Sequence, residues 1–472
     1  MARLEHDFLG EVEVPDEAYY GVQTVRALEN FSITGYRMHP LFIRAMAMVK
    51  KAAALANMEA GLLDPVIGKA IVQAANEVIE GKLNDQFVVD PIQGGAGTSA
   101  NMNMNEVLAN RALEILNHPR GSYHRISPNT HVNMSQSTND VFPTAIRITA
   151  LHAAWRLLET LNRLQDAFQS KGVEFDHVVK MGRTHLQDAV PIRLGQEFRA
   201  YAKMIQRDIN RLRKARELLY EVNIGATAIG TSLNADPIYI EAVIRHLQEI
   251  SEIPHLHLPE DMVDGTQNTD ALVELSGALR VLATNLGKIM NDLRLMASGP
   301  RCGLNEINLP PLQPGSSIMP GKVNPVMAEA VNQVCYQVLG NDLTIGLASQ
   351  AGQFELNVME PVMAFNLIQS LDILRNVLDS FIEKCLLGIT ANEERCRDAV
   401  EHSIGIVTAL SPHLGYESTA EIAREAYRTG RSVRDICLER GLFTSRELDE
   451  ILSVRGMTEP GIAARHLLQA RR

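Results

Sequence analysis

A long seam of apolar residues near the middle of the chain limits the folds that this sequence can adopt. Its members recur at alternating steps of three and four: Leu272, Leu275, Leu279, Leu282, Leu286, Ile289, Leu293 and Met296. A second series has the same spacing: Leu367, Leu371, Leu374, Leu378, Phe381 and Cys385. This heptad spacing is typical of helices that pack like coiled coils in a bundle. Only 5% of the residues are aromatic, and long segments lack proline, so the composition also favours helices.

The chain has 472 residues, which exceeds the size at which one hydrophobic core usually stops growing. We therefore expect three parts: an N-terminal domain (1–143), a central helical bundle domain (144–389) and a small C-terminal helical domain (390–472). Five long helices fit the central part, with breaks near residues 172–191, 223–236, 251–264, 298–324 and 353–361. A helix of 30 residues is about 45 Å long, which outreaches one compact domain. Association of bundles from several chains is the expected consequence.

Charge and segment composition exclude several classes of protein. Forty-five basic and 56 acidic residues give a formal net charge of −11 without a long basic block, so nucleic acid and anionic membrane are poor partners. The N-terminus does not resemble a signal peptide and no run of 18 apolar residues occurs, so we expect a soluble, cytoplasmic protein. The five cysteines include no C-x-x-C pair, which indicates neither disulfides nor a zinc site. Cys335 and Cys385 fall in helical patterns and are expected in the core.

Four polar segments stand just before predicted helices, and three of them are ambiguous when taken alone. Gln93–Ser99 is rich in glycine, but it lacks the ending of a P-loop, and a turn followed by a Thr or Ser cap explains it better than a phosphate site. Gln136–Asp140 lies ahead of Pro143 and a long helix, and it offers four capping-type side chains where one suffices. That surplus indicates a ligand. Gly182–Asp188 contains His185, and a single histidine is more often structural than catalytic.

The fourth segment, Gly315–Pro325, carries the strongest signal. Pro325 suits the first position of the following helix, so Asn324 is either its N-cap or a ligand-binding residue. Lys322 is harder to explain as structure, because a cation near the positive end of a helix dipole is unfavourable unless an anion lies beside it. Together the four segments predict a site for a small dianion.

The Gly315–Pro325 stretch, GSSIMPGKVNP, resembles the signature loop of the fumarase and aspartase superfamily at eleven consecutive positions. The resemblance extends over essentially the whole chain, from Tyr19–Thr24 to Ser403–Thr408. Within the superfamily the sequence is more similar to the aspartate ammonia-lyases. Gln93–Ser99 reads QGGAGTS, where fumarases typically carry a GSGTQ-type segment, and Thr138 stands where fumarases usually have a second serine.

This resemblance implies an all-α, fumarase/aspartase-like fold of three domains. The central long-helix bundles of four chains would form a multi-helix core in a homotetramer, and each active site would combine segments from three subunits. The implied activity is that of a carbon–nitrogen lyase, the reversible elimination of ammonia from L-aspartate to give fumarate. No cofactor and no metal site are expected.

The resemblance also implies a role for each candidate residue. Ser316 would be the base, acting as an oxyanion that removes a proton from the carbon next to a carboxylate. The carboxylate that becomes an enediolate would be held by Thr98, Ser137, Thr138 and Ser317. The other carboxylate would be held by Thr184, Lys322 and Asn324. The amino group would contact Asn139 and His185, with His185 oriented by Glu329.

Two alternative functions remain open at this point. The first is fumarate hydration by a class II fumarase, which uses the same elimination chemistry. The second is a non-catalytic, structural role on a lyase scaffold, and it is disfavoured because both Ser316 and Lys322 are present.

Overall fold

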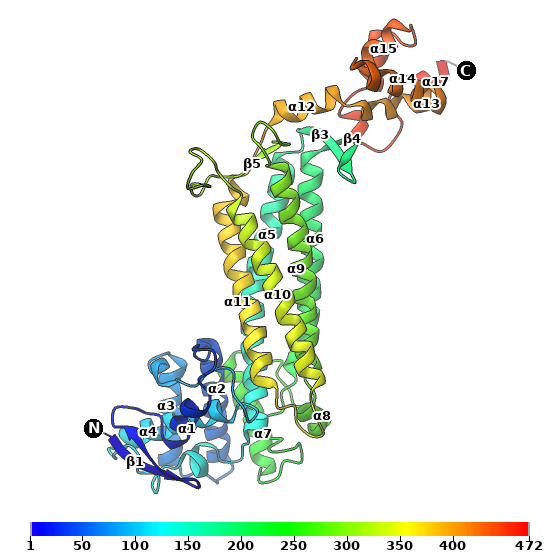
Figure 1. The fold of residues 1–472 in the computed structure, drawn as a ribbon. Helices are drawn as coiled ribbons and strands as arrows, with labels where there is room; N and C mark the ends of the chain where they lie inside the picture. Colours follow the sequence, from blue (N-terminus) through cyan, green and yellow to red (C-terminus); the bar gives the residue numbers. More distant parts are fainter. Residues whose placement is uncertain (1, 471–472) are drawn as a thin grey trace. The chain divides into compact units, whose positions relative to one another are not determined.

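The computed structural model describes residues 2–470, and in them helices dominate (Figure 1). The five long helices are α5 (Thr138–Glu174), α6 (Leu194–Glu217), α9 (Asp270–Met296), α10 (Val326–Gln350) and α11 (Glu360–Lys384). The shorter ones are α1 (Val22–Asn30), α2 (Pro40–Glu59), α3 (Pro65–Ile79), α4 (Thr98–Ile115), α7 (Pro237–Ser251), α8 (Met262–Gln267), α12 (Glu393–His402), α13 (Ser411–Leu414), α14 (Tyr416–Thr429), α15 (Val433–Glu439), α16 (Ser445–Ile451) and α17 (Leu467–Ala470). The all-α prediction is confirmed.

The strands form three short antiparallel pairs and no larger sheet within the described residues. The pairs are β1 (Ala2–Asp7) with β2 (Gly10–Pro15), β3 (Val179–Thr184) with β4 (Gln187–Arg193), and β5 (Ile307–Asn308) with β6 (Thr390–Ala391). None of the described helices combines the length and the apolar character that a membrane span requires.

The chain divides into two compact units, and the boundary falls inside each of the five long helices. Unit 1 comprises the residues up to Glu159 together with Asn210–Ala283 and Cys335–Arg375. Unit 2 comprises Thr160–Ile209, Thr284–Val334 and the residues from Asn376 onward. The three-domain division at residues 143/144 and 389/390 remains a prediction.

Several helices of unit 1 begin at an acidic cap followed by proline. Asp64 accepts hydrogen bonds from the backbone N–H groups of Val66 and Ile67, and Pro65 is the first residue of α3. Asp236 caps α7 in the same way, with Pro237 as the first helical residue. The oxygen of the aspartate cap accepts a hydrogen bond from an N–H group that has no acceptor within the helix. Proline has no N–H group that needs an acceptor. An aspartate followed by a proline therefore fixes the start of α3 and the start of α7.

In unit 2 the C-terminal helices have a core of their own. Its side chains come from the turn after α12, from α14, α15 and α16, and from the connection between α15 and α16: Ile406, Leu410, Ile422, Ile436, Leu448, Ile451 and Phe443. Met181 of β3 belongs to the same cluster. The β3–β4 hairpin is therefore packed against the C-terminal helices.

Both apolar series predicted from the sequence are buried. No side chain in either series is more than 5% exposed, and Leu286 is completely buried. Cys335 and Cys385 are also buried, as expected. The heptad periodicity therefore identifies the packed faces of α9 and α11 correctly.

Shortening a side chain in the seam should destabilise the protein. Leu286→Ala removes buried methyl groups and leaves a cavity, so the free energy of unfolding should fall by about 2–5 kcal/mol. Leu286→Met preserves the volume and should cost less than about 1.5 kcal/mol. Chemical denaturation followed by circular dichroism measures both values. Equal effects of the two substitutions would contradict close packing at this position.

Candidate active site

The glycine-rich segment before α4 is a tight turn that places Thr98 at the start of the helix. Gly95, Ala96 and Gly97 all have positive φ angles, of 82°, 55° and 91°. The hydroxyl of Thr98 donates a hydrogen bond of 2.7 Å to the Gly95 carbonyl. The interpretation of Thr98 or Ser99 as an N-cap is wrong, because Gly97 occupies the cap position and makes no side-chain cap.

Gly97 also allows a close approach between the starts of α4 and α5. A Cβ atom at Gly97 would lie 2.3 Å from a ring carbon of Phe142, which is far inside van der Waals contact. The amide of Asn101 in α4 donates to the Thr138 hydroxyl in α5 at 3.1 Å. Thr98 and Thr138 thus stand on the first turns of two helices that pack closely together.

The segment before α5 forms a reciprocal cap. The hydroxyl of Ser137 accepts a hydrogen bond from the Asn139 N–H at 3.2 Å. The carboxylate of Asp140 accepts one from the Ser137 N–H at 2.9 Å. This arrangement follows the logic of a capping box, in which the two side chains satisfy N–H groups at opposite ends of the first turn.

The prediction that the helix follows Pro143 is wrong, since α5 begins at Thr138 and contains this proline. Proline has no N–H, so the carbonyl of Asn139 loses its usual helical donor. The amide of Asn223 replaces that donor at 3.0 Å. The side chain of Asn139 donates in turn to the Ala228 carbonyl at 2.7 Å. A contact from a distant segment therefore lets the helix continue through Pro143.

Asp140 is a fully buried carboxyl group beneath this turn. Besides Ser137, it accepts hydrogen bonds from the N–H groups of Gly225 and Thr227, each at 3.0 Å. Burial raises the pKa of Asp140 to about 7, although the three N–H donors and the charge of Lys50 act in the opposite direction. Asp140 joins the α5 cap to the segment after α6.

Lys50 is a buried cation that sequence reasoning missed. Its ammonium donates to the side-chain oxygens of Asn133, at 3.1 Å, and Gln136, at 2.9 Å. Asn101 donates to the same oxygen of Asn133 and also to Thr138. Burial lowers the pKa of Lys50 to about 7. The signal in the sequence is a lysine on the apolar face of α2, where a charge needs a polar partner.

The β3–β4 hairpin in unit 2 carries Thr184 and His185. Thr184 pairs with Gln187, which leaves His185 and Leu186 as a two-residue turn. Both turn residues have positive φ angles, of 52° and 62°. Their side chains are exposed, so His185 is presented at the surface of the unit.

The signature loop surrounds Ser316 with backbone N–H groups. The hydroxyl oxygen of Ser316 accepts hydrogen bonds from the N–H of Ile318, at 3.2 Å, and of Met319, at 3.0 Å. Ser316 is half-buried, while the neighbouring Ser317 is exposed. Two N–H dipoles directed at one oxygen stabilise negative charge on it.

Asn324 closes this loop and does not cap the next helix. Because α10 begins at Val326, Pro325 is the residue that directly precedes it. The amide of Asn324 donates to the Gly315 carbonyl at 2.8 Å, and the Gly315 N–H donates to the Lys322 carbonyl at 2.7 Å. The N-cap interpretation of Asn324 is therefore wrong, because its side chain joins the two ends of the loop.

Lys322 is exposed and borders two hollows in unit 2. One, of about 450 Å³, is also lined by Ser316. The other, of about 700 Å³, is also lined by Asn324 and by Arg294 near the end of α9. The proposed base and the proposed carboxylate-binding cation thus share one face of the loop.

The predicted site residues fall into two groups, one in each unit. Unit 1 holds Thr98, Ser137, Thr138 and Asn139. Unit 2 holds Thr184, His185, Ser316, Ser317, Lys322, Asn324 and Glu329. Glu329 accepts a hydrogen bond from Gln333 at 3.3 Å, and the described residues show none between Glu329 and His185. In Figure 1 the loop near β5 and the β3–β4 hairpin lie apart within unit 2.

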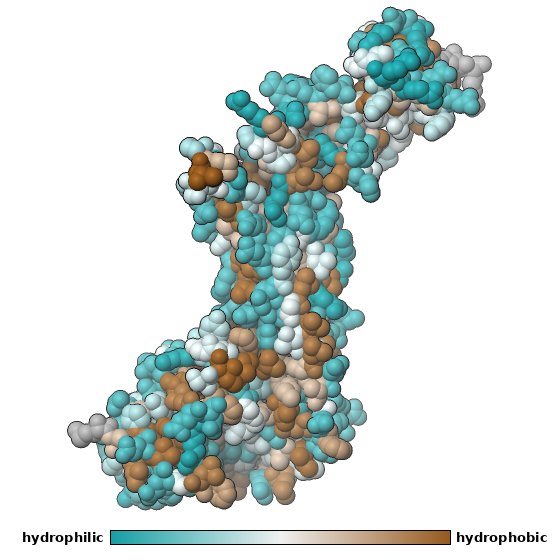
Figure 2. All heavy atoms as spheres, in the orientation of Figure 1, coloured by the Kyte–Doolittle hydropathy of each residue, from teal (hydrophilic) through white to brown (hydrophobic). Residues whose placement is uncertain are grey.

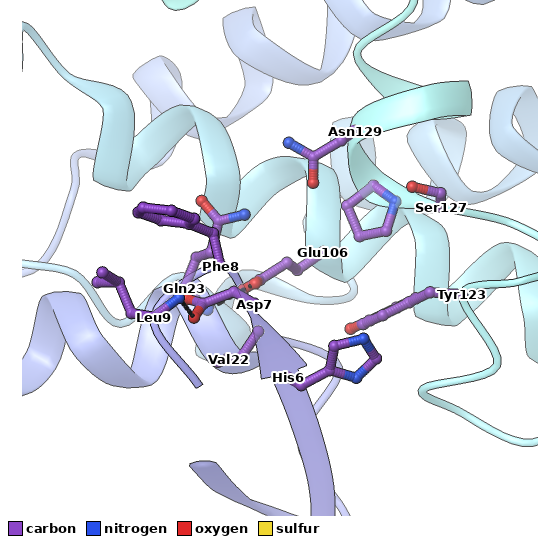
Figure 3. A pocket seen from close by; sticks show the side chains of 11 residues that line it. His6, Asp7, Phe8, Leu9, Val22, Gln23, Glu106, Tyr123, Ser127 and Asn129 are labelled. Carbon is purple, nitrogen blue, oxygen red and sulfur yellow. Dashed lines mark hydrogen bonds between the residues drawn. The ribbon is translucent and has the colours of Figure 1, made fainter. Parts of the chain in front are cut away.

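A further hollow, of about 480 Å³, lies near β1 in unit 1 and contains none of the predicted site residues. Figure 3 shows Glu106 reaching toward Gln23 there. Both carboxylate oxygens of Glu106 accept hydrogen bonds from backbone N–H groups, those of Gly21, Gln23 and Thr24. This carboxylate holds the start of α1, which is a structural role.

No group of three or more potential metal-binding side chains occurs in the described part of the chain.

Asp140 should make the stability of the fold depend on pH. Because its pKa is raised from 3.8 to about 7, the folded protein retains a proton that the unfolded chain releases. The free energy of unfolding of the wild-type protein, relative to that of Asp140→Asn, should therefore decrease as the pH rises from about 4 to about 7. Denaturation of both proteins at about pH 5 and about pH 7 tests this. A free-energy difference that does not change with pH would refute it.

Two families of known sequence match the chain. The family described as "Lyase" matches residues 10–340, and the one described as "Fumarase C C-terminus" matches residues 406–459. An aspartate ammonia-lyase of Bacillus subtilis is 62% identical over 467 residues, which cover 99% of this chain and 98% of the relative. One from Escherichia coli is 50% identical over 466 residues, which cover 98% and 97%.

Solved structures agree with the sequence relatives. A structure described as fumarate lyase:delta crystallin from Brucella melitensis, bound to cobalt, has a TM-score of 0.95 at 51% identity and covers 98% of this chain and 100% of that one. A class II fumarase from Schistosoma mansoni has a TM-score of 0.92 at 36% identity, with the same coverage. The chain therefore belongs to the aspartate ammonia-lyases, carbon–nitrogen lyases of the fumarase/aspartase superfamily.

Proposed function

We propose that this protein catalyses the reversible elimination of ammonia from L-aspartate to give fumarate, as a cytoplasmic homotetramer. The relatives named aspartate ammonia-lyase support the substrate, since several are 50–63% identical over nearly the whole chain. The structural observation that carries the mechanism is the position of Ser316, whose oxygen accepts two backbone hydrogen bonds.

Ser316 acts as the base in this proposal. A serine hydroxyl is a weak base until it ionises, so its environment has to stabilise an alkoxide. The N–H groups of Ile318 and Met319 already point at the oxygen, and Lys322 lines the same hollow. The alkoxide removes a proton from the carbon next to one carboxylate, and that carboxylate becomes a doubly charged enediolate.

Formation of the enediolate is the main energetic obstacle, and fixed hydrogen-bond donors lower the energy of this intermediate. Its proposed donors are Thr98, Ser137, Thr138 and Ser317. Three of these stand at the first turns of α4 and α5, where helix N-termini favour negative charge. Removing one donor should cost about 10²- to 10³-fold in rate.

The remaining residues hold the rest of the substrate. Thr184, Lys322 and Asn324 bind the second carboxylate, and Asn139 and His185 contact the amino group before it leaves, with Glu329 orienting His185. Because Thr184 and His185 are exposed on a hairpin and Lys322 on a loop, each is accessible to a ligand.

An assay with alternative substrates tests the activity directly. Incubation with L-aspartate, L-malate or argininosuccinate, followed by ultraviolet absorbance of fumarate, separates an ammonia-lyase from a fumarate hydratase. The hydratase alternative is favoured by the similarity to the class II fumarase and disfavoured by Thr138. Release of fumarate from malate but not from aspartate would overturn the proposal. Inactivity with all three would favour the structural role.

Ser316→Ala should abolish turnover and leave folding and assembly unchanged, because the side chain belongs to a loop outside the core. Initial rates, circular dichroism and sedimentation of the variant measure these properties. Ser317→Ala is the matched control, and it should retain more activity because it removes one donor and not the base. Near-normal turnover of Ser316→Ala would remove this residue from the mechanism.

The surface of α10 supports the assembly. Four large side chains on this helix are 37–65% exposed at steps of three and four: Tyr336, Leu339, Leu343 and Leu347. Figure 2 shows apolar surface along this part of α10. Monomeric proteins rarely expose such a continuous stripe, and its spacing suits packing against another helix. A second copy of the chain is the proposed partner.

Shared active sites predict complementation between inactive variants. If His185 and Ser316 of one site come from different subunits, Ser316→Ala and an inactivating His185 variant should rescue each other when they are unfolded, mixed and refolded. In an equal mixture roughly a quarter of the sites receive both intact residues under closed tetrameric symmetry. Each variant refolded alone is the control. Hybrid tetramers no more active than their parents would place both residues of each site in one chain.

A further inference from the structure

A cluster of four charged side chains, two of them buried and two partly buried, lies at the base of the β3–β4 hairpin in unit 2: Lys180, Glu306, Arg183 and Glu197. The ammonium of Lys180 lies 2.9 Å from the carboxylate of Glu197 and 2.9 Å from that of Glu306. The guanidinium of Arg183 lies 2.7 Å from the other oxygen of Glu306. Lys180 is 3% exposed and Glu306 is 1% exposed, so water screens these ion pairs very little.

Each oxygen of Glu306 therefore faces a cation from the same strand. Burial lowers the pKa of Lys180, but the charges of Glu197 and Glu306 outweigh this effect and raise it above its usual value. Removing one partner from such a cluster leaves a buried charge uncompensated, which is far more costly than losing an exposed ion pair. Among the described residues, Glu306 is the carboxylate that contacts both Lys180 and Arg183 of β3.

The main chain of Glu306 is itself fixed from two directions. Its N–H donates to the Met296 carbonyl at the end of α9, at 2.8 Å. Its carbonyl accepts hydrogen bonds from the Asn392 N–H, at 2.9 Å, and from the Cys396 thiol, at 3.7 Å. Glu306 is thus a rigid anchor to which the hairpin is attached.

The ion pairs span an irregular part of the hairpin. The register shifts between Met181 and Arg183, and such irregularities increase the local twist of a strand pair. In a flat strand Lys180 and Arg183 would point to opposite faces. In this structure both Lys180 and Arg183 contact Glu306. This carboxylate therefore holds the twisted hairpin on both sides of the register shift.

The turn at the tip of the hairpin has an unfavourable backbone conformation. A two-residue turn with positive φ at both positions strongly favours Asn-Gly, yet His185 and Leu186 occupy it. A left-handed backbone is unfavourable for residues other than glycine, because Cβ comes too close to the following carbonyl oxygen. Leu186 is 70% exposed, so burial does not offset the strain. Two contacts set the direction of the tip. One is at the base, where Arg183 directly precedes Thr184, and the other is at Asp188, which accepts a hydrogen bond from the Ser403 hydroxyl at 3.2 Å.

We propose that Glu306 is a positioning residue that aims Thr184 and His185 at the substrate by holding Arg183 and the twisted strand β3. This inference rests on the proposed function. Glu306 does not touch the substrate in this scheme, and its effect passes through the hairpin. The alternative is a general contribution of the cluster to stability, without a specific effect on His185.

A double-mutant cycle distinguishes the two roles. Glu306→Gln keeps the volume but removes the charge, so the hairpin should shift and kcat/KM for aspartate should fall about 10²-fold. In a His185→Ala background, followed over a longer incubation, the same substitution should cost less than about 3-fold, because the residue it positions is already gone. An equal loss in both backgrounds would overturn the proposal.

Two further variants protect the test against misfolding. Arg183→Gln removes the ion pair between Arg183 and Glu306 at the less buried of its two residues. Its loss of kcat/KM should also be much smaller in the His185→Ala background. Glu360→Gln is the matched control, since Glu360 is another buried carboxyl group, on α11 in unit 1. Its effect, of any size, should be equal in both His185 backgrounds. A dependence on His185 for Glu360→Gln as strong as for Glu306→Gln would also overturn the proposal.

Hydrogen exchange gives a readout that does not require activity. The backbone amides of Thr184–Gln187 should exchange faster in Glu306→Gln than in the wild-type protein, whereas those of α4 should not change. Unchanged exchange at the tip would contradict the positioning role. If the wild-type protein forms no fumarate from aspartate, the proposed function fails, while the exchange experiment still decides whether Glu306 holds the hairpin.

Discussion

Burial of the two apolar series along α9 and α11 is the interaction on which the rest of the structure depends. A fully buried leucine stabilises the fold by roughly 1.5–3 kcal/mol relative to an exposed one, and both series are buried throughout. The packed helices fix where their ends lie, and most of the proposed site residues stand at or near helix starts. At a helix start the N–H groups have no helical acceptors and are available for an anion.

The sequence periodicity predicts the helices well because one face of each must be apolar. The five long helices and their breaks follow from this pattern alone. Its failures occur where a distant group compensates for a local signal. Pro143 indicates a helix start, but the helix continues through it because the amide of Asn223 donates to the carbonyl of Asn139, 84 residues earlier in the chain. Asn324 looks like a cap, but the carbonyl of Gly315 takes its amide.

Residue type identifies candidates for the site, but not the groups that support them. Ser316 and Lys322 are conspicuous because a hydroxyl and a cation before a helix need an explanation. Lys50 is marked in the sequence only by its place on the apolar face of α2, and Glu306 has no local signal. Their burial and long-range contacts show that each is bonded to a segment with proposed site residues. The pairing of Glu306 with Arg183, 123 residues apart, has no local signature.

The two N–H groups that surround the Ser316 oxygen belong to residues only two and three positions later in the chain. The environment that would stabilise an alkoxide is therefore a property of the local backbone conformation, which the core does not impose. If that short stretch lost its conformation, Ser316 would revert to an ordinary alcohol while every helix stayed in place. Under the proposed mechanism, the reactivity of Ser316 would therefore exist only while the loop is folded.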